Sequence, residues 1–363
     1  MKSKPVIFRT AFLYLGAVIG AGFASGRENW QYFGIFGEDA YKGILLATGL
    51  FVFMGMTTTY IAGKLKTTDM GKIVLPVRSE KASHILGWIF AIMIYNALIS
   101  MSAAGGSLLN QLTGAPAAAG GAAVVFLVIV TVLGDFERVS GVFGYVVPLL
   151  FAVVAGVCIY VAVFFEPTGE PINTKPSAMA STWYVSAAVY VAYNIMGTIP
   201  INANSAIRSG SGVKSAAGAA LGGVGLGVLG LALTTALLKD PSVSDNLDLP
   251  MLGFAQEINS PVGWLFAIIL LVSIYSSATG TYYGFCCKLK NDDRKKYKVV
   301  FFAVLGFALG LCGFRNIVTY VYPVMGYAGF VVIILTAFNF IRILIESGKG
   351  KFEDEQDCKC GLH

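Results

Sequence analysis

Glycines and polar residues interrupt an apolar segment near the amino terminus. Four glycines fall within residues 16–26, and a polar stretch ending at Glu28 follows within the same apolar run. Each glycine costs a helix interior about 1 kcal/mol relative to alanine. Close helix packing is the usual use of small residues in membrane helices, but packing glycines recur at every fourth position. Gly20 and Gly22 are only two positions apart, so the pattern predicts unwound backbone. The four glycines are Gly16, Gly20, Gly22 and Gly26.

Unwound backbone at membrane depth can bind other molecules, because its N–H and C=O groups have no helical partners. Amides at the start of a half-helix suit a carboxylate, and we expect Ala21, Gly22 and Phe23 to present such amides. Carbonyls at the end of a half-helix suit a cation or an ammonium group. We expect Gly16 and Ile19 to present these carbonyls.

A second interrupted segment lies between Tyr193 and Ser205, where Gly197 and Pro200 accompany three asparagines. Proline removes one helical hydrogen bond and clashes with the preceding turn. The combination predicts a second break around Asn194 to Pro200. The carbonyls of Tyr193 and Asn194 are then expected to face the first break, with Gly197 in the substrate site.

The composition indicates which elements must position these segments. Of 363 residues, 56% are hydrophobic, 13% are charged and 43 are glycine. A typical globular domain has about 25% charged residues, and one membrane-spanning helix needs about 20 apolar residues. We therefore predict an all-α polytopic membrane protein with ten transmembrane helices. The spans are about Pro5–Phe36, Ala40–Gly63, His84–Leu112, Pro116–Leu133, Val139–Phe165, Thr182–Ile207, Val213–Leu238, Val262–Cys287, Val299–Phe314 and Ile317–Ile345.

Two broken helices in positions one and six are typical of a secondary transporter with its site near the membrane midplane. Five spans per half place the halves in opposite orientation, which predicts a 5+5 inverted repeat. We expect one transmembrane transporter domain over residues 1–363, with repeat one at about 5–165 and repeat two at about 182–345. Residues 346–363 form a predicted cytoplasmic tail.

The distribution of positive charge predicts the orientation and excludes a nucleic-acid partner. The net charge is +6, and the Lys and Arg residues concentrate in alternate loops between apolar spans. This pattern is an orientation signal and places both termini in the cytoplasm. We expect a multi-pass membrane protein. The opposite side receives only Arg27, Lys42, Lys175, Lys239 and Arg315.

Motifs for catalysis are weak here, and we predict that the chain is not an enzyme. The GxGxxG pattern of Gly225–Gly230 lies inside an apolar span without a preceding strand, so helix packing explains it. Cys358 and Cys360 with His363 offer a possible metal site, but reduced cysteines of a cytosolic tail explain them better. The segment from Leu249 to Ile258 predicts a short external helix starting at Pro250, either a gate or a surface helix.

The chain resembles the amino acid–polyamine–cation (APC) superfamily with the fold of the leucine transporter LeuT, and more closely the YkvI-type family of bacterial membrane proteins. The resemblance covers essentially the whole chain and implies a location in the bacterial inner (plasma) membrane. It rests on Gly20-Ala-Gly-Phe-Ala-Ser-Gly-Arg-Glu28, on Tyr322-Pro-Val-Met-Gly-Tyr-Ala-Gly329 and on the overall length. Glutamine is usual in the family where this chain has Arg27.

The resemblance implies a sodium site between the first and eighth helices. By resemblance, Ser276 and Ser277 supply side-chain oxygens, Ser273 a carbonyl, and Gly16 and Ile19 the remaining carbonyls. An alternative is that these hydroxyls bond back to their own helix. A second sodium site is expected to be missing, because Ala17, counted here with the substrate-binding residues, stands where the family's fold uses asparagine. No other cofactor is expected.

A proton is the alternative coupling ion, and Glu28 is its candidate carrier, since an acid at membrane depth is a functional hypothesis by default. Glu28 could instead be a carboxylate of the outer rim, paired with Arg27 or Arg315. The expected selectivity residues are Tyr95 and Asn96 in the third span, Asn194 in the sixth and Tyr275 in the eighth. Aromatic walls with few polar contacts suit a small organic cation or zwitterion.

The sequence thus predicts a sodium-coupled symporter of a small amino acid or related amine or zwitterion, working by alternating access. The alternatives are a proton-coupled transporter of another small organic solute and, in a different class, an ion channel. The expected partners are a small-molecule substrate and the lipid bilayer. The sequence determines neither the substrate nor the oligomeric state.

Overall fold

The computed structural model describes residues 6–77, 79–134, 136–290 and 292–348, with residues 136–147 described by their backbone alone. These residues form helices and connecting loops, and no strand occurs among them. The tail residues Cys358, Cys360 and His363 lie outside the described part of the chain.

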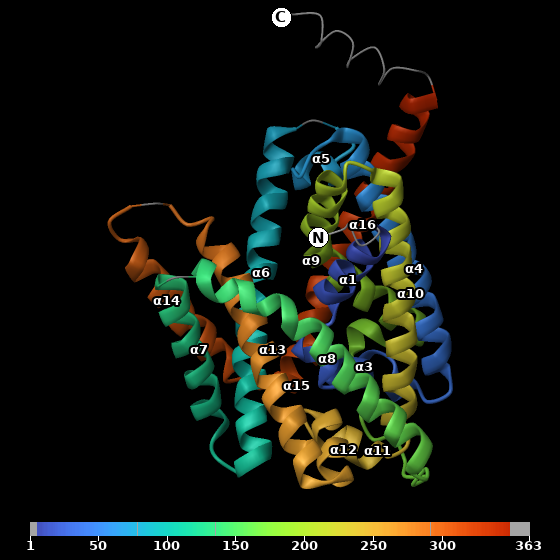
Figure 1. Ribbon diagram of the computed structural model, residues 1–363, viewed down its shortest axis with the longest axis vertical. Coiled ribbons are helices and arrows are strands. Elements are labelled where there is room, and N and C mark those ends of the chain that lie inside the picture. The colour runs from blue at the N-terminus through green and yellow to red at the C-terminus, as the bar shows by residue number, and fades with distance from the viewer. Residues whose placement is uncertain (1–5, 78, 135, 291, 349–363) are drawn as a thin grey trace, which may run out of the picture.

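Seven long helices form the body of the molecule (Figure 1). They are α4 (Asp39–Leu65), α6 (Glu80–Thr113), α8 (Phe136–Phe164), α9 (Trp183–Ser209), α10 (Gly212–Leu237), α13 (Ser260–Cys286) and α16 (Tyr322–Gly348). Three helices of intermediate length are α1 (Val6–Val18), α7 (Ala117–Leu133) and α14 (Lys295–Gly310). The short elements are α2 (Ala21–Ala24), α3 (Arg27–Tyr32), η1 (Gly34–Phe36), α5 (Met70–Val74), η2 (Ala178–Ala180), α11 (Pro241–Asn246), α12 (Pro250–Ile258), α15 (Phe314–Asn316) and the π-helix η3 (Ile317–Val321).

Six helical segments of the described chain are long and apolar enough to cross a membrane. Shorter apolar helices occupy three of the remaining predicted spans, at Val6–Val18, Ala117–Leu133 and Pro148–Phe164. The chain is therefore a multi-pass membrane protein, as predicted. The count of ten spans and the inverted repeat remain predictions. The six segments are Asp39–Leu65, Glu80–Thr113, Trp183–Ser209, Gly212–Leu237, Ser260–Cys286 and Phe314–Ser347.

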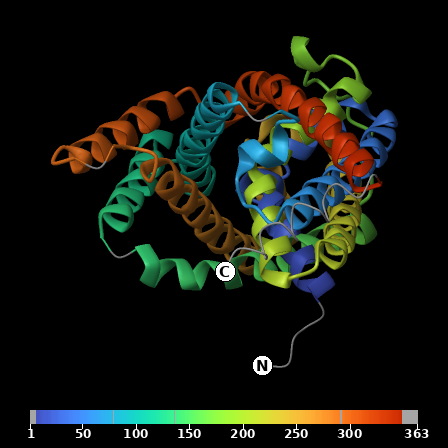
Figure 2. The same cartoon turned by 90° about the horizontal axis from the view of Figure 1, so that it is seen from above.

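The helices pack in two groups that share the first segment of the chain. In one group α10 packs on α4 and α1, and α9 packs on α4 and α16. In the other, α6 contacts α7, α13 and α14, and the view from above shows α7 and α14 to one side of the first group (Figure 2). The short helix α2 contacts α6 and α13, so it lies where the two groups meet.

Glycines of α10 allow the close packing in the first group. A Cβ on Gly222 would approach the Tyr14 ring, one on Gly223 would meet the backbone of Val52, and one on Gly227 would overlap the Thr48 side chain. Within a membrane the hydrophobic effect does not drive helices together, so they associate by close packing, and small residues let their backbones approach. Within the GxGxxG pattern, Gly225 faces Leu15 of α1 and Gly227 faces Thr48 of α4, so its interpretation as helix packing is confirmed.

The loop between α10 and α13 folds into α11 and α12, which lie together at one end of the molecule (Figure 1). The predicted helix after Leu249 is present, and Pro250 occupies its first turn. Proline is favoured there because the first N–H groups of a helix have no intrahelical acceptor. Asp240 caps α11 by accepting hydrogen bonds from the backbone N–H groups of Ser242 and Val243.

Candidate functional site

The first span is interrupted twice, within the region near Gly20 to Gly26 where the sequence predicted a break. The helix α1 ends at Val18, Gly20 has an extended conformation (φ −100°, ψ −173°), and α2 begins at Ala21. A second interruption follows at Gly26, whose φ of +80° lies in the left-handed region that favours glycine. The chain therefore crosses this region as three short helical pieces, with non-helical backbone between them.

The backbone groups that we expect to bind an ion or a solute have no helical partners, because the interruption removes those partners. Among the described residues, no hydrogen bond engages the N–H groups of Ala21, Gly22 and Phe23. The carbonyls of Gly16 and Ile19 likewise have no donor there. Ala17 lies in the last turn of α1 and is half-buried. Such groups are expensive to leave unpaired inside a protein, so they are candidates for binding an ion or a solute.

One serine of α13 lies beside the break. A Cβ built on Gly20 would stand 3.8 Å from the Ser277 hydroxyl oxygen, in ordinary van der Waals contact. The other two serines bond to each other, since the Ser276 hydroxyl donates to the Ser273 carbonyl at 3.1 Å. Of the predicted sodium ligands on α13, the structure therefore brings Ser277 directly to the break, and Ser276 makes the back-bond that was the alternative.

The predicted break in the sixth span is wrong, because α9 is one continuous helix from Trp183 to Ser209. Two of its three asparagines bond back to the helix itself: Asn194 Nδ2 donates to the Tyr190 carbonyl at 3.0 Å and Asn204 Nδ2 to the Pro200 carbonyl at 2.9 Å. The third, Asn202, donates through Nδ2 to the Thr58 hydroxyl of α4 at 3.0 Å. Pro200 deprives only the carbonyl of Met196 of its helical donor. The carbonyls of Tyr193 and Asn194 thus lie within a helix, and Gly197 is exposed on it.

Two of the predicted selectivity residues direct their hydroxyl groups to other helices. The Tyr95 hydroxyl donates to the Phe302 carbonyl of α14 at 2.9 Å, and its ring lies 5.0 Å from that of Phe285. The Tyr275 hydroxyl pairs with the Thr131 hydroxyl of α7 at 2.5 Å. Asn96 is buried within α6. These residues lie in the second group of helices.

Glu28 instead lies against the break. Its side chain is 4% exposed, and its carboxylate covers Gly22 so closely that a Cβ there would overlap Glu28 Oε1. No Lys or Arg of the described chain stands within ion-pair distance of it, since the salt bridges of these residues all involve other carboxylates. The alternative that Glu28 pairs with Arg27 or Arg315 is therefore wrong.

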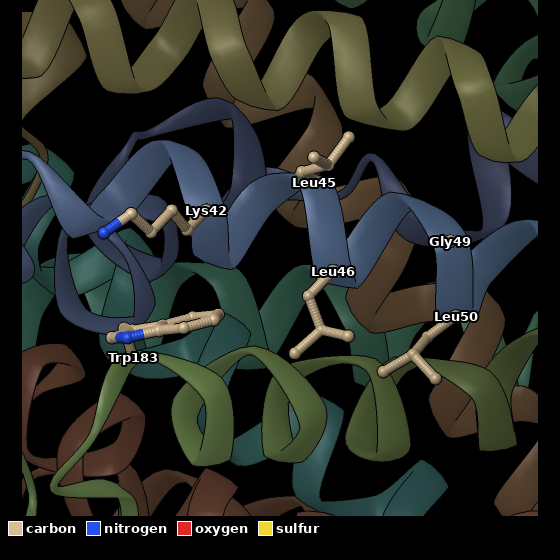
Figure 3. Close-up of a pocket in the computed structure, with 6 residues that line it drawn as sticks. All are labelled: Lys42, Leu45, Leu46, Gly49, Leu50 and Trp183. Atoms are coloured by element: carbon tan, nitrogen blue, oxygen red, sulfur yellow. The ribbon is translucent and has the colours of Figure 1, made fainter.

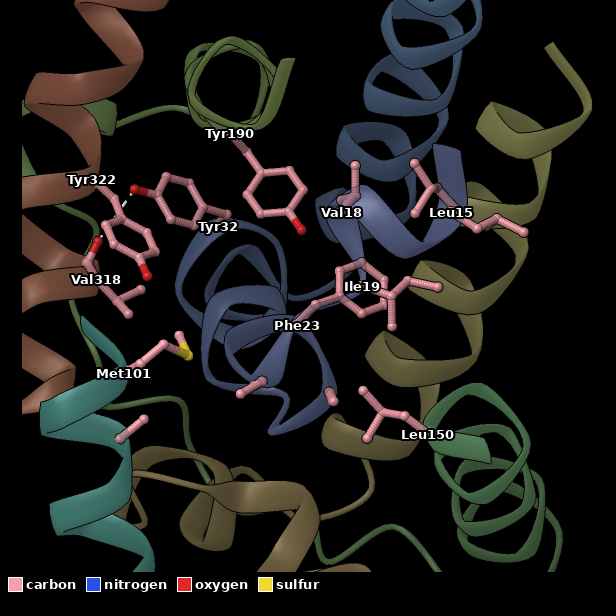
Figure 4. Packing of buried hydrophobic residues seen from close by; sticks show 14 of the residues in the cluster. Leu15, Val18, Ile19, Phe23, Tyr32, Met101, Leu150, Tyr190, Val318 and Tyr322 are labelled. Atoms are coloured by element: carbon pink, nitrogen blue, oxygen red, sulfur yellow. Dashed lines mark hydrogen bonds between the residues drawn. The ribbon is translucent and has the colours of Figure 1, made fainter. Parts of the chain in front are cut away.

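Four tyrosines surround this part of the first span and are called here the tyrosine cluster. The Tyr193 hydroxyl donates to Glu28 Oε1 at 3.5 Å, and the Tyr193 ring stacks on Tyr322 with centroids 4.3 Å apart. The ring centroids of Tyr32 in α3 and Tyr190 in α9 are 5.3 Å apart, and Figure 4 shows the two rings next to each other. The cluster consists of Tyr32, Tyr190, Tyr193 and Tyr322.

Sequence reasoning missed Tyr32, Tyr190 and Tyr322 as members of the site. Spacing offered a signal, because residues three or four apart share a helix face. Glu28 and Tyr32 are four apart in α3, and Tyr190 and Tyr193 are three apart in α9. Tyr322 stood within the segment that carries the family resemblance, but nothing local linked it to Glu28.

Arg27 extends toward α11 and the loop after it rather than toward Glu28. Its Nη1 donates to the carbonyls of Ser244 and Leu247, both at 3.1 Å, although the side chain is fully buried. Three residues on, Trp30 Nε1 donates to Asp245 Oδ1 at 2.9 Å. These bonds hold α3 to α11 and to the loop that follows it.

The amino terminus of α12 and the π-helix complete the surroundings of the first span. The Met251 N–H donates to the Ser25 carbonyl at 2.9 Å, beside the interruption at Gly26. In η3, the Val318 carbonyl accepts from the Tyr32 hydroxyl at 3.2 Å, a bond drawn in Figure 4. π-helical turns are frequent at functional sites. The segment is therefore bonded to α12 at Ser25 and to η3 at Tyr32.

A groove of about 440 Å³ lies elsewhere, on the outer face of α4 where α9 begins. In Figure 3 the Trp183 ring lies between the two helices, with leucine side chains along the groove. Lys42 at its end pairs with Asp39 at 2.7 Å. Its apolar lining suits contact with lipid. The groove shares no residue with the break, so it is not the candidate site.

No family model matches the chain. It is 24% identical over 330 residues to the uncharacterized membrane protein YkvI of Bacillus subtilis (strain 168), covering 90% of this chain and 94% of that protein. It is also 23% identical over 320 residues to the uncharacterized protein YyaD of the same organism, covering 86% and 91%. The predicted resemblance to YkvI is confirmed.

Among solved structures, the chain is similar to MhsT in complex with L-phenylalanine. The TM-score is 0.56 at 16% sequence identity, and the match covers 95% of this chain and 98% of MhsT. At that identity the likeness concerns the fold. The chain is therefore a multi-pass membrane protein similar to YkvI along almost its whole length, with the LeuT-type fold of MhsT.

Proposed function

We propose that the chain is a secondary active transporter, a sodium-coupled symporter of a small amino acid or a related amine or zwitterion. The observation that carries the proposal is the interruption of the first span beside Ser277 of α13. Unpaired backbone at the centre of a membrane bundle is tolerated where it binds a ligand or lines a cavity. The LeuT-type fold supports the same conclusion.

In this proposal the ion is held between α1 and α13. The unbonded carbonyls of Gly16 and Ile19 and the hydroxyl of Ser277 supply oxygen atoms from neutral groups, which suit a weakly held monovalent cation. Ser273 and Ser276 would join them if their mutual hydrogen bond opens. The ion then stabilises one arrangement of the two helix groups, which is how binding couples to a change of access.

The topology of the proposal is ten spans in a 5+5 inverted repeat, with both termini in the cytoplasm and a single transport domain. Because α9 is continuous, the backbone groups of the site come from the first span alone, and α9 contributes side chains. The two groups of helices meet at α2, so a relative movement of the groups would open or close the site at that point.

Proton coupling is a second candidate, and one specific observation favours it. Glu28 is buried beside the break without a cationic partner in the described chain. A carboxyl group in such a position must bind a proton or another cation.

The test is uptake by purified protein in liposomes across a panel of amino acids and amines, with inward gradients of sodium, of protons, or of neither. We expect a sodium gradient to drive accumulation above the external concentration. Accumulation driven by a proton gradient alone would support proton coupling, the second candidate, in place of sodium coupling. Flux that never exceeds equilibrium would support a channel, and no solute movement would contradict the transporter proposal.

A further inference from the structure

We propose that Glu28 and the tyrosine cluster bind the ammonium group of the transported solute. The inference rests on the proposed transport function and narrows its substrate to molecules that carry a protonated amine. A carboxylate on the solute is then optional, so amines as well as amino acids should bind.

The first step is the absence of a counter-charge at Glu28. Within the described residues its single hydrogen-bond donor is Tyr193, at the long distance of 3.5 Å. The neighbouring Arg27 is bonded to loop carbonyls instead. Removing an ionised carboxylate from water without a partner is very costly, so this position favours a bound cation.

The second step is the aromatic surroundings. Tyr193 and Tyr322 form a stacked pair with an interplanar angle of 26°, and Tyr190 lies 6.4 Å from Tyr193 between centroids. The faces of aromatic rings attract cations, most strongly where water is excluded, and cages of such rings recognise organic ammonium groups. The Tyr190 hydroxyl is buried and has no hydrogen-bond partner in the described chain, so it is available to a ligand.

The third step is the position of the carboxylate relative to the break. Gly22 is the reason that Glu28 can fold back over α2, because any side chain there would displace Oε1. The tyrosines come from α3, α9 and the start of α16, so three separate elements enclose the carboxylate. A solute held there would connect these elements and could change their arrangement on binding.

The surroundings favour an ammonium group over an inorganic ion. A sodium ion needs several oxygen ligands at once, whereas the hydrogen bond to Glu28 in the described chain comes from Tyr193, whose ring contacts the rings of Tyr190 and Tyr322. An alkylammonium group needs only a few hydrogen-bond acceptors and benefits from ring faces. A proton on Glu28 is the competing occupant, and the experiment below separates the two.

The test is ligand binding to the purified full-length protein, measured by isothermal titration calorimetry and by thermal stabilisation. Two matched series are used: phenethylamine, L-phenylalanine and 3-phenylpropionate, and ethylamine, L-alanine and propionate. A ligand that binds the folded state raises its stability. We expect the amine and the amino acid of at least one series to bind, and the corresponding acid to bind at least about tenfold more weakly.

Variants then locate the contact. Glu28→Gln should weaken binding of the amine at least about tenfold, while Glu257→Gln, at an exposed carboxyl of α12, should leave it unchanged. Tyr193→Phe keeps the ring and should change affinity less than Tyr193→Leu. If Glu28→Gln does not fold, the comparison of amine with acid on the unmodified protein still decides the matter.

Several outcomes would overturn the inference. These are equal binding of acid and amine, no binding of either amine, and full amine binding by Glu28→Gln. If Glu28→Gln loses proton-driven uptake but still binds the amine, the Glu28 carboxyl carries the proton and does not bind the ammonium group. Because binding is measured without transport, amine binding with no uptake would contradict the transporter proposal alone. Sodium-driven uptake that is unchanged in Glu28→Gln would contradict the inference about Glu28 and leave the transporter proposal intact.

Discussion

The Glu28 carboxylate lies directly over the backbone of Gly22, in a space that a single methyl group at Gly22 would fill. The two residues stand on opposite sides of the interruption at Gly26, which turns α3 so that its first residues face back toward α2. The contact therefore depends on two glycines: Gly26 provides the turn, and Gly22 provides the space.

Gly22→Ala should displace the Glu28 side chain. The new Cβ would overlap Oε1 and lie within 2.7 Å of the carboxyl carbon, so the side chain must move into the surrounding tyrosines. We expect a loss of about 1–3 kcal/mol in the free energy of unfolding, as for other overpacked sites, measured by thermal and denaturant unfolding in detergent.

Gly197→Ala is the matched control for this change. Gly197 lies in the helix α9 with open space around its α-carbon. The higher helix propensity of alanine should leave stability unchanged or raise it by up to about 1 kcal/mol. Equal behaviour of the two variants would show that the Glu28 carboxylate does not occupy the space above Gly22.

Ser277→Ala should weaken the sodium response. Of the predicted sodium ligands on α13, the Ser277 hydroxyl is the one that lies beside Gly20 at the break. We expect the sodium concentration for half-maximal uptake to rise at least about tenfold, which corresponds to 1.4 kcal/mol of lost ion binding. The measurement is initial uptake in liposomes over a range of sodium concentrations.

Thr281→Val provides the control on the same helix. The Thr281 hydroxyl donates to the Ser277 carbonyl at 2.7 Å, a bond to its own helix. Its loss should leave the sodium dependence in place. A Ser277→Ala protein with unchanged sodium dependence would remove the proposed ion site while leaving the transport proposal intact.

The sequence predicted those features whose cause is local. Glycines two positions apart cannot share a packing face, so the interruption near Gly20 was predictable. Pro250 after a loop predicted the start of α12 for a similar reason. The same reasoning failed at Asn194 and Pro200, because composition cannot tell whether a polar side chain lines a cavity or bonds to the preceding helical turn.

The surroundings of Glu28 depend on contacts between distant parts of the chain. Sequence reasoning paired Glu28 with Arg27 or Arg315 as one possibility, since adjacent opposite charges suggest it. In the structure the Arg27 side chain donates to the carbonyls of Ser244 and Leu247, and Glu28 faces the tyrosine cluster. Adjacent residues in a helix point about 100° apart, so proximity in sequence is a poor guide to pairing.

Arg27→Ala should destabilise the protein more than Arg27→Gln does. The guanidinium supplies the donor to the carbonyls of Ser244 and Leu247, and its Nε and Nη2 are buried without partners in the described chain. Alanine leaves both carbonyls unsatisfied, at a cost of about 1–3 kcal/mol. Glutamine keeps an amide donor and removes a buried charge, so its cost should be smaller. Thermal unfolding in detergent compares the two, and equal losses would contradict a hydrogen-bonding role.

Asp245→Asn should loosen α11 and α12 from the first span. The Asp245 carboxylate accepts from Trp30 Nε1 and from the backbone N–H groups of Asn173, at 2.6 Å, and Thr174, at 3.1 Å. An asparagine side chain has one oxygen acceptor, so at least one of these donors loses its partner. Hydrogen exchange over residues 241–258 should become faster, by roughly tenfold for a loss of about 1.4 kcal/mol.

The same substitution distinguishes the two interpretations of α12, a gate or a surface helix. If α12 acts as a gate, looser contacts should speed solute exchange, because Met251 bonds to Ser25 beside the interruption at Gly26. Ser242→Ala is the control, since Ser242 lies in α11 and its hydroxyl bonds only to Asp240 among the described residues. Faster hydrogen exchange with unchanged solute exchange would identify α12 as a surface helix. Faster release of bound solute in Asp245→Asn, and not in Ser242→Ala, would identify α12 as a gate. Only Asp245→Asn loosens the contacts that hold α11 and α12 against the first span.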